Sequence, residues 1–215
     1  MTTSSRTLRS AIAALALLIP VAVAAAPATA APRDPVVYDA LGDSYGSGYG
    51  VPPYSATCGR SEAAYAVQID GRMRIDLDDF AACAGATTTS MLASQLGALD
   101  ADTDLVTVSI GGNDIGWGTV VGACVAAGDA PCAGALAATT GVITTALPAV
   151  LDATYAQIAA AAPDAHVVVT AYPRLFSPEY GAYLNASPAE QQALAAGKFH
   201  AAFGSAGITA ERVAL

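Results

Sequence analysis

Short apolar runs that end in glycine-rich or polar loops predict four β-strands. Residues 36–41 are apolar and rich in β-branched side chains, and a loop with several glycines follows them directly. Residues 105–110 alternate two sets of side chains and end at a glycine pair, which is typical of a strand. Residues 75–80 have a weaker strand pattern, and the short apolar run over residues 167–170 predicts a buried strand.

Apolar residues at helical spacing fill the intervals between these strands. Residues 61–69 predict a short helix with a serine cap, and residues 89–96 predict a helix on one face of the sheet. Residues 135–161 predict a long helical region that Pro148 divides or kinks. A capping-box pattern begins a last helix over residues 187–203. The alternation predicts a parallel sheet with helices on both faces, joined by right-handed crossovers.

The N-terminus has the pattern of a secretory signal peptide. Two arginines precede an uncharged apolar run over residues 11–26, and small residues follow it up to Ala30. A membrane span is the competing interpretation, but the run contains Pro20 and barely reaches the length that a bilayer requires. We therefore expect residues 1–30 to be cleaved, and residues 31–215 to form one secreted, extracellular domain.

The charge of the mature chain excludes one class of partner. The leader carries two arginines and no acidic residue, so its removal takes the formal net charge from −9 to −11. Affinity for nucleic acid comes largely from basic side chains on phosphates. We therefore expect no nucleic-acid partner.

Four cysteines in a chain bound for an oxidising compartment predict two disulfides. Three pairings are open, and we favour the one between neighbours, Cys58 with Cys83 and Cys124 with Cys132. A zinc site is the rival interpretation. The spacings contain no Cys-x-x-Cys and the chain has two histidines, so we expect no metal.

Polar residues that could carry chemistry follow three of the predicted strands. In an open parallel sheet, ligands bind outside the carboxyl ends of the strands. Ser44 lies in the block Gly-Asp-Ser-Tyr-Gly after the first strand, Gly85 follows the second, and Asn113 lies in Gly-Gly-Asn-Asp after the third. Each of them alone is most simply a turn or loop residue. Their occurrence together at three strand ends favours a functional site.

Two glycine motifs overlap this region and fit it poorly. Residues 42–46 match G-x-S-x-G, but the nucleophile elbow of an α/β-hydrolase follows a central strand, whereas this block follows the first strand of the mature chain. A dinucleotide fingerprint fails because Val51 stands in place of its third glycine.

The three blocks resemble the SGNH, or GDSL, hydrolase family, and their surroundings look like its secreted bacterial lipases and esterases. The matching surroundings are residues 110–116 and residues 172–176, and the cysteines lie where those secreted members place two of their disulfides. The resemblance implies a three-layer α/β/α fold with a flavodoxin-like parallel sheet. It also implies a carboxylic ester hydrolase without cofactor or metal, acting as a monomer on a small-molecule ester or lipid substrate, with contact to a lipid interface.

In the family pattern, Ser44 is the nucleophile, and the oxyanion hole comprises the backbone amides of Ser44 and Gly85 and the side-chain amide of Asn113. Attack by Ser44 on an ester carbonyl produces a tetrahedral oxyanion that needs donors already in place. Gly85 lets a carbonyl approach without a Cβ in the way. Acyl transfer therefore explains why these residue types occur together.

The usual catalytic histidine has no clear counterpart. Family members carry it near the C-terminus, usually as Asp-x-x-His followed by proline. His166 opens the last predicted strand, and His200 falls inside the last predicted helix, with Gly197 where the aspartate should stand. We expect a domain that is incomplete at its C-terminus, in which His200 is the remaining candidate for the base. The alternative is a catalytically impaired secreted protein that binds acyl or glycan ligands.

Overall fold

The described part of the chain covers the predicted sheet and the loops that hold the candidate site. A computed structural model describes residues 34–55, 57–126 and 128–172. These residues belong to one compact unit that begins at Asp34. The predicted signal peptide over residues 1–30, the predicted helix over residues 187–203 and His200 lie outside the described residues.

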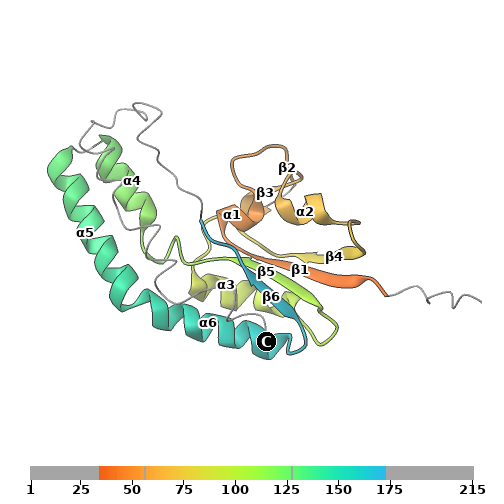
Figure 1. Ribbon diagram of the computed structural model, residues 1–215. Coiled ribbons are helices and arrows are strands. Elements are labelled where there is room, and N and C mark those ends of the chain that lie inside the picture. The colour runs from red at the N-terminus through yellow and green to blue at the C-terminus, as the bar shows by residue number, and fades with distance from the viewer. Residues whose placement is uncertain (1–33, 56, 127, 173–215) are drawn as a thin grey trace, which may run out of the picture. The chain divides into compact units, whose positions relative to one another are not determined.

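The predicted strands all form, each within one residue of its predicted bounds. They are β1 (Val36–Gly42), β4 (Ile75–Phe80), β5 (Leu105–Ser109) and β6 (His166–Val169). The strands are parallel and lie in the order β4-β1-β5-β6, which matches the first four strands of a flavodoxin-like sheet (Figure 1). Relative to β1, β4 is added on one side of the sheet, and β5 and β6 are added on the other, so the strand order changes direction between β1 and β5. Ligands of such sheets bind at the carboxyl ends of strands beside this switch point.

Helices pack on both faces of the sheet and produce the three layers that the sequence predicts. On one face, α3 (Thr88–Ser94), α5 (Asp129–Thr145) and α6 (Leu147–Ala161) contribute to the largest buried cluster together with β1, β5 and β6. On the other face, α2 (Tyr65–Ile69) packs against β1 and β4 through a smaller cluster (Figure 1). The fully buried residues that fill these two clusters include Leu41, Met91, Val106, Val108, Leu151 and Ile158 in the first and Tyr38, Ala40 and Ala66 in the second.

Two helices begin at other residues than predicted. α2 begins at Tyr65 and not at Ser61, because Ser61 belongs to a hairpin of β2 (Tyr54–Ser55) and β3 (Arg60–Ser61). The Ser61 hydroxyl accepts from the Ala63 N–H at 2.9 Å, so it caps a turn before the helix. α5 begins six residues before its predicted start, at Asp129.

The sequence pattern missed α4 (Trp117–Ala126). Gly118 and Gly122 lie inside it, and glycine is among the weakest helix formers. A disulfide between Cys124 and Cys132 ties α4 to α5. Tertiary packing and this covalent link therefore outweigh the low local helix propensity.

The long helical region breaks where Pro148 was expected to divide it. α5 ends at Thr145, α6 begins at Leu147 with the proline in its first turn, and the two helices meet at 50°. Proline lacks the N–H that would continue the preceding helix. Among the described helices, none is by itself long and apolar enough to cross a membrane; taken together across their bend, α5 and α6 reach that length and composition.

Both favoured disulfides form. Cys58 pairs with Cys83 at a Cα–Cα distance of 4.4 Å, and Cys124 pairs with Cys132 at 4.3 Å. The first joins the loop after the β2 strand to the loop after β4, which carries Gly85. One predicted site residue therefore lies on a covalently anchored loop.

Candidate active site

Ser44 lies at the carboxyl end of β1, as the first residue of the one-turn helix α1 (Ser44–Ser47). Asp43 caps this turn, because its Oδ1 accepts from the Tyr45 N–H at 2.9 Å. Gly48 closes the other end in a left-handed conformation with φ of 71°. These contacts hold the turn in place. Ser44 itself is partly exposed, so a ligand can reach the turn.

The backbone before Ser44 is fixed by buried polar contacts. Gly42 has a φ of +133°, and a Cβ there would lie 2.5 Å from the carbonyl oxygen of Ser109. The Asp43 N–H donates to that same oxygen at 2.8 Å. The buried Gln95 side chain accepts from the Gly42 N–H at 2.8 Å and donates to the Gly42 carbonyl at 2.9 Å. The backbone conformation at the carboxyl end of β1 is therefore fixed.

Gly85 lies in a tight turn between β4 and α3, closed by the Ala86 N–H donating to the Cys83 carbonyl at 3.0 Å. Its φ is +84°, and a Cβ would meet no atom within 4 Å, so the glycine is required by backbone conformation and not by space. The Cys83 N–H donates to the Gly42 carbonyl at 3.0 Å, which fastens the turn to the end of β1.

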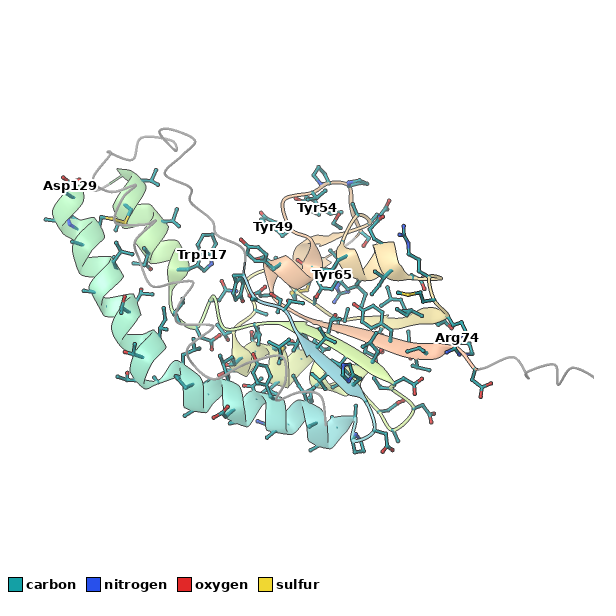
Figure 2. All side chains as sticks on the ribbon, viewed as in Figure 1. Tyr49, Tyr54, Tyr65, Arg74, Trp117 and Asp129 are labelled. Carbon is teal, nitrogen blue, oxygen red and sulfur yellow. A yellow bond between two sulfur atoms is a disulfide. The ribbon has the colours of Figure 1, made fainter. Side chains whose placement is uncertain are left out.

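The Asn113 carboxamide is held at both ends. Its Nδ2 donates to the Ala86 carbonyl at 2.8 Å, and its Oδ1 accepts from Trp117 Nε1 at 3.3 Å. Because the indole N–H can only donate, the orientation of the amide is determined, and one Nδ2 hydrogen is left over for a ligand. Figure 2 shows Trp117 at the start of α4, and the indole also packs against the largest core cluster.

The three predicted site residues thus lie on loops at one edge of the sheet that are hydrogen-bonded to one another. The Gly85 turn is bonded on one side to Gly42, two residues before Ser44, and on the other side to Asn113. Within the described residues, the backbone N–H groups of Ser44 and Gly85 have no hydrogen-bond acceptor. An oxyanion site requires donors of this kind, which are in place and have no acceptor of their own.

The two aspartates beside the site residues order loops. Asp114 accepts from the Thr88 N–H and, at 2.6 Å, from the Thr88 hydroxyl, so it binds the first turn of α3. Asp43 is 1% exposed and accepts from Tyr45, Ser109 and the Tyr172 hydroxyl. Burial raises the pKa of Asp43, and these hydrogen bonds oppose the rise.

Two residues of this region had no predicted role, Gln95 and Tyr172. Gln95 could have been noticed as a polar residue four positions after Met91 on the inward face of a helix. Tyr172 follows the last described strand, and the resemblance included it without a function. Burial and the neighbouring Asp43 charge raise the pKa of Tyr172, which stays protonated and can donate.

The described residues contain one histidine, and it lies far along the strands from the site. His166 begins β6 and pairs with Leu105, the first residue of β5, whereas Ser44 follows the last residue of β1. Because the strands are parallel, His166 lies at the amino ends of the strands and Ser44 lies at their carboxyl ends. His166 is therefore a residue that begins a strand, and His200 lies outside the described residues.

A cluster of carboxylates elsewhere in the sheet has its own partners. Asp39, Asp78 and Asp79 lie within 4.8 Å of one another. Asp39 is buried, and its two oxygens accept from the Asp79 N–H at 2.9 Å and the Thr103 hydroxyl at 2.7 Å. Burial, and then the charges of the two exposed aspartates, raise the pKa of Asp39. The Asp39 carboxylate therefore forms hydrogen bonds that hold β1 to β4 and to the loop that contains Thr103.

Comparison with known proteins connects this geometry to a family. Residues 40–204 match the family model described as GDSL-like Lipase/Acylhydrolase family. The chain is 41% identical over 142 residues to Lipase 1 of Streptomyces coelicolor and 40% identical over 175 residues to a lipase of Streptomyces rimosus. These matches cover 65% and 78% of this chain, and 53% and 65% of the two relatives. The chain thus spans between about half and two thirds of their length.

Two solved structures share the fold. An extracellular lipase from Streptomyces rimosus matches with a TM-score of 0.74 at 32% identity, and phospholipase A1 from Streptomyces albidoflavus NA297 matches with 0.75 at 31%. Each match covers 82% of this chain and 77% of the other. The α/β fold with its four-stranded parallel sheet is therefore that of these lipases. With the family model covering most of the chain, the protein belongs to the GDSL-like lipase/acylhydrolase family.

Proposed function

We propose that the protein is a secreted hydrolase of carboxylic esters that forms an acyl-enzyme on Ser44. The observation that carries this proposal is the convergence of the site loops. Ser44 is partly exposed at a strand end, on a loop that is hydrogen-bonded to the Gly85 turn, and this turn is also bonded to Asn113. Among the described residues the backbone N–H groups of Ser44 and Gly85 have no acceptor, and the Asn113 amide has a determined orientation. Membership of a lipase family supports the same reaction class.

The reaction proceeds in two displacements. Ser44 Oγ forms a bond to the ester carbonyl carbon, its proton passes to a base, and the carbonyl electron pair moves onto the oxygen. The N–H groups of Ser44 and Gly85 and the Asn113 Nδ2 donate to that oxyanion. Collapse of the intermediate expels the alcohol, which takes up the proton. Water then attacks the acyl group by the same route and releases the acid and free Ser44.

The general base is the part of this mechanism that the described residues do not contain. His166 lies at the amino ends of the parallel strands, whereas Ser44 lies at their carboxyl ends, so His166 cannot take the Ser44 proton. His200 is the other histidine of the sequence and the one to test. The test below also distinguishes a second candidate function, in which the site binds acyl or glycan ligands with little or no turnover.

Acyl lipids are the substrate class that the surface beside Ser44 favours. The segment of residues 45–59 contains no charged side chain. It exposes Tyr49, Val51 and Tyr54, and the two tyrosine rings stack with centroids 5.7 Å apart on the loop next to α1 (Figure 2). Tyrosine suits a lipid boundary, because its ring is apolar and its hydroxyl is polar. The names of the relatives, lipase and phospholipase A1, agree with this class.

Secretion is supported by the two disulfides and by a relative of the same fold. Both pairs of cysteines are bridged, which is typical of proteins in oxidising compartments. One of the similar structures is an extracellular lipase. We therefore assign the protein to the extracellular space.

The proposal is tested by replacing Ser44. The parent should hydrolyse a chromogenic short-chain ester and should be labelled by a serine-reactive phosphonate, and Ser44→Ala should reduce both to background. Ser94→Ala, which changes an exposed serine on α3, is the matched control and should behave like the parent. Equal rates in the parent and Ser44→Ala would reject the enzyme. An unlabelled parent that still binds acyl ligands would favour the second candidate function.

A further inference from the structure

One phenol oxygen connects the two loops on which the proposed reaction depends. The Tyr172 hydroxyl donates to Asp43 Oδ2 and accepts from the Gly112 N–H at 3.0 Å. Asp43 directly precedes the nucleophile Ser44, and Gly112 directly precedes Asn113. Tyr172 itself follows β6, the fourth strand of the sheet, and lies 129 residues from Asp43 along the chain.

The surroundings of Tyr172 are shaped for a phenol. A Cβ on Gly112 would lie 3.0 Å from both the Cζ and the hydroxyl oxygen of Tyr172, so a larger residue at position 112 would push the ring away. The ring also packs edge-on against Tyr45, with centroids 5.0 Å apart at 90°. Tyr45 follows Ser44 directly, so Tyr172 contacts residues on both sides of the nucleophile.

We propose that Tyr172 is a positioning residue for the reaction of Ser44, because its hydroxyl sets the distance between the nucleophile turn and the loop that carries the Asn113 amide. This inference rests on the proposed function. Donors to an oxyanion act only when they are in place before charge develops, and displacements of about 1 Å can cost on the order of 100-fold in rate. The two hydrogen bonds of Tyr172, which follows β6, fix the distance between these two loops.

The bridge also has an electrostatic consequence. Among the residues that the structure describes, the titratable groups that interact with the buried Asp43 are the hydroxyls of Tyr172, Tyr45 and Tyr65, whose pKa values are raised first by burial and then by the Asp43 charge. The Tyr172 hydrogen bond lowers the pKa of Asp43. Its removal therefore moves protonation of Asp43 to higher pH. Because the Asp43 carboxylate accepts from the Tyr45 N–H and so caps the turn that carries Ser44, the acid limb of the reaction should move in the same direction.

Tyr172→Phe is the decisive variant, because it removes both hydrogen bonds and keeps the ring. The rate of Ser44 labelling by a p-nitrophenyl phosphonate, followed by nitrophenolate release, should fall roughly 10- to 100-fold. On a short-chain ester kcat should fall by the same factor while KM changes less than about twofold, because the bridge acts on geometry at the reacting atoms. The acid limb of the pH profile should move to higher pH.

Tyr155→Phe is the matched control. Tyr155 is a partly buried tyrosine on α6 that packs against the core, and among the described residues it forms no hydrogen bond or ring contact with Ser44, Gly85 or Asn113. Its replacement should leave the labelling rate, kcat and the pH profile unchanged. If Tyr172→Phe reacts as fast as the parent with the same pH profile, or if Tyr155→Phe causes an equal loss, the positioning role is overturned.

A spectroscopic measurement separates this inference from the proposed function. In the folded parent and in Tyr172→Phe, NMR should show shifted amide signals for Gly112 and Ser44 and a higher titration midpoint for the Asp43 carboxyl carbon in the variant. If Ser44→Ala and the parent react alike, the proposed function fails, and the bridge is judged by these signals alone. Unchanged Gly112 and Asp43 signals would overturn it.

Discussion

The Asn113 amide illustrates how one side chain is prepared for one task. Trp117 Nε1 and the Ala86 carbonyl occupy its Oδ1 and one Nδ2 hydrogen. A side chain held in this way loses little conformational entropy when it donates to a ligand. Its contribution should therefore be seen in the transition state more than in substrate binding.

Asn113→Ala tests this contribution. Loss of one oxyanion donor typically lowers kcat about 100- to 1,000-fold, and we expect that range here with little change in KM. Steady-state kinetics on a short-chain ester measures both constants. Trp117→Phe is the companion variant: it removes the indole donor but leaves Asn113, so its kcat should fall less. A kcat for Asn113→Ala within twofold of the parent would show that the amide does not face the oxyanion.

Gly42 is constrained by the close approach of two strands. Gly42→Ala would combine an unfavourable φ of +133° with a Cβ 2.5 Å from a backbone oxygen, and the oxygen belongs to a central strand that cannot yield. We expect a loss of roughly 2 to 4 kcal/mol in the free energy of unfolding. Urea denaturation measures it.

Gly134→Ala provides the opposite expectation for the same substitution. Gly134 lies within α5, and a Cβ there meets no atom within 4 Å. Alanine should stabilise the helix by about 0.5 to 1 kcal/mol. Similar free energies of unfolding for the two variants would contradict the strain assigned to Gly42.

Local sequence patterns account for most elements and for the three proposed site residues. β1 and β5 were predicted to within a residue because apolar runs with β-branched side chains that end in glycine are a local signal, and β4 and β6 followed from weaker or shorter apolar runs. Ser44, Gly85 and Asn113 could be placed at one edge because parallel strands share a direction. α4 was not predicted because its two glycines lower the local helix propensity. The disulfide to α5 stabilises the helix in the folded protein, and no local pattern shows this.

The supporting contacts of the site could not be predicted because they depend on how elements cross. Gln95 was recognisable as part of a helix, but its two hydrogen bonds to Gly42 join positions 53 residues apart. The Tyr172 bridge joins positions 129 residues apart. Such contacts follow from the packing of α3 and the loop after β6 against the end of β1, and no local pattern encodes them.

The two disulfides should differ in their effect on the site. In the chain-entropy model, the separations of 25 and 8 residues correspond to about 3.5 and about 2.6 kcal/mol of stability. The Cys58–Cys83 bridge ends two residues before Gly85, so its removal should also slow labelling of Ser44. Removal of Cys124–Cys132 should lower stability alone.

Paired cysteine-to-alanine variants test this difference. Thermal unfolding gives the stability of each variant, and phosphonate labelling below the unfolding temperature gives the reactivity of Ser44. Equal labelling rates in the two double variants would show that the Gly85 turn does not depend on its disulfide.

The buried carboxylate of Asp39 contributes to how the stability of the molecule varies with pH. The pKa of Asp39 is raised in the folded state, chiefly by burial, so the folded state binds its proton more readily than the unfolded chain does. Its contribution to stability is fully present below the ordinary aspartate pKa and is lost as the pH rises through the raised value. Folding should therefore be favoured at mildly acidic pH compared with neutral pH as far as this group is concerned.

Asp39→Asn should remove that contribution to the pH dependence. Its carboxamide can still accept from the Asp79 N–H and can donate to the Thr103 hydroxyl, and it carries no charge against Asp78 and Asp79. We expect the variant to be more stable than the parent at neutral pH, with a smaller difference at pH 4. Urea denaturation across this range is the measurement, and identical pH profiles would contradict the role of Asp39.

The uncharged segment beside Ser44 has a consequence for how ionic strength affects the protein. The full sequence is acidic, with a formal net charge of −9 that becomes −11 without the predicted leader, yet residues 45–59 contain no charged side chain. Long-range repulsion should therefore slow encounters with anionic vesicles, and added salt should relieve it, because the Debye length falls to roughly 8 Å at physiological ionic strength. Neutral vesicles of the same acyl chain should react at a rate that salt leaves unchanged.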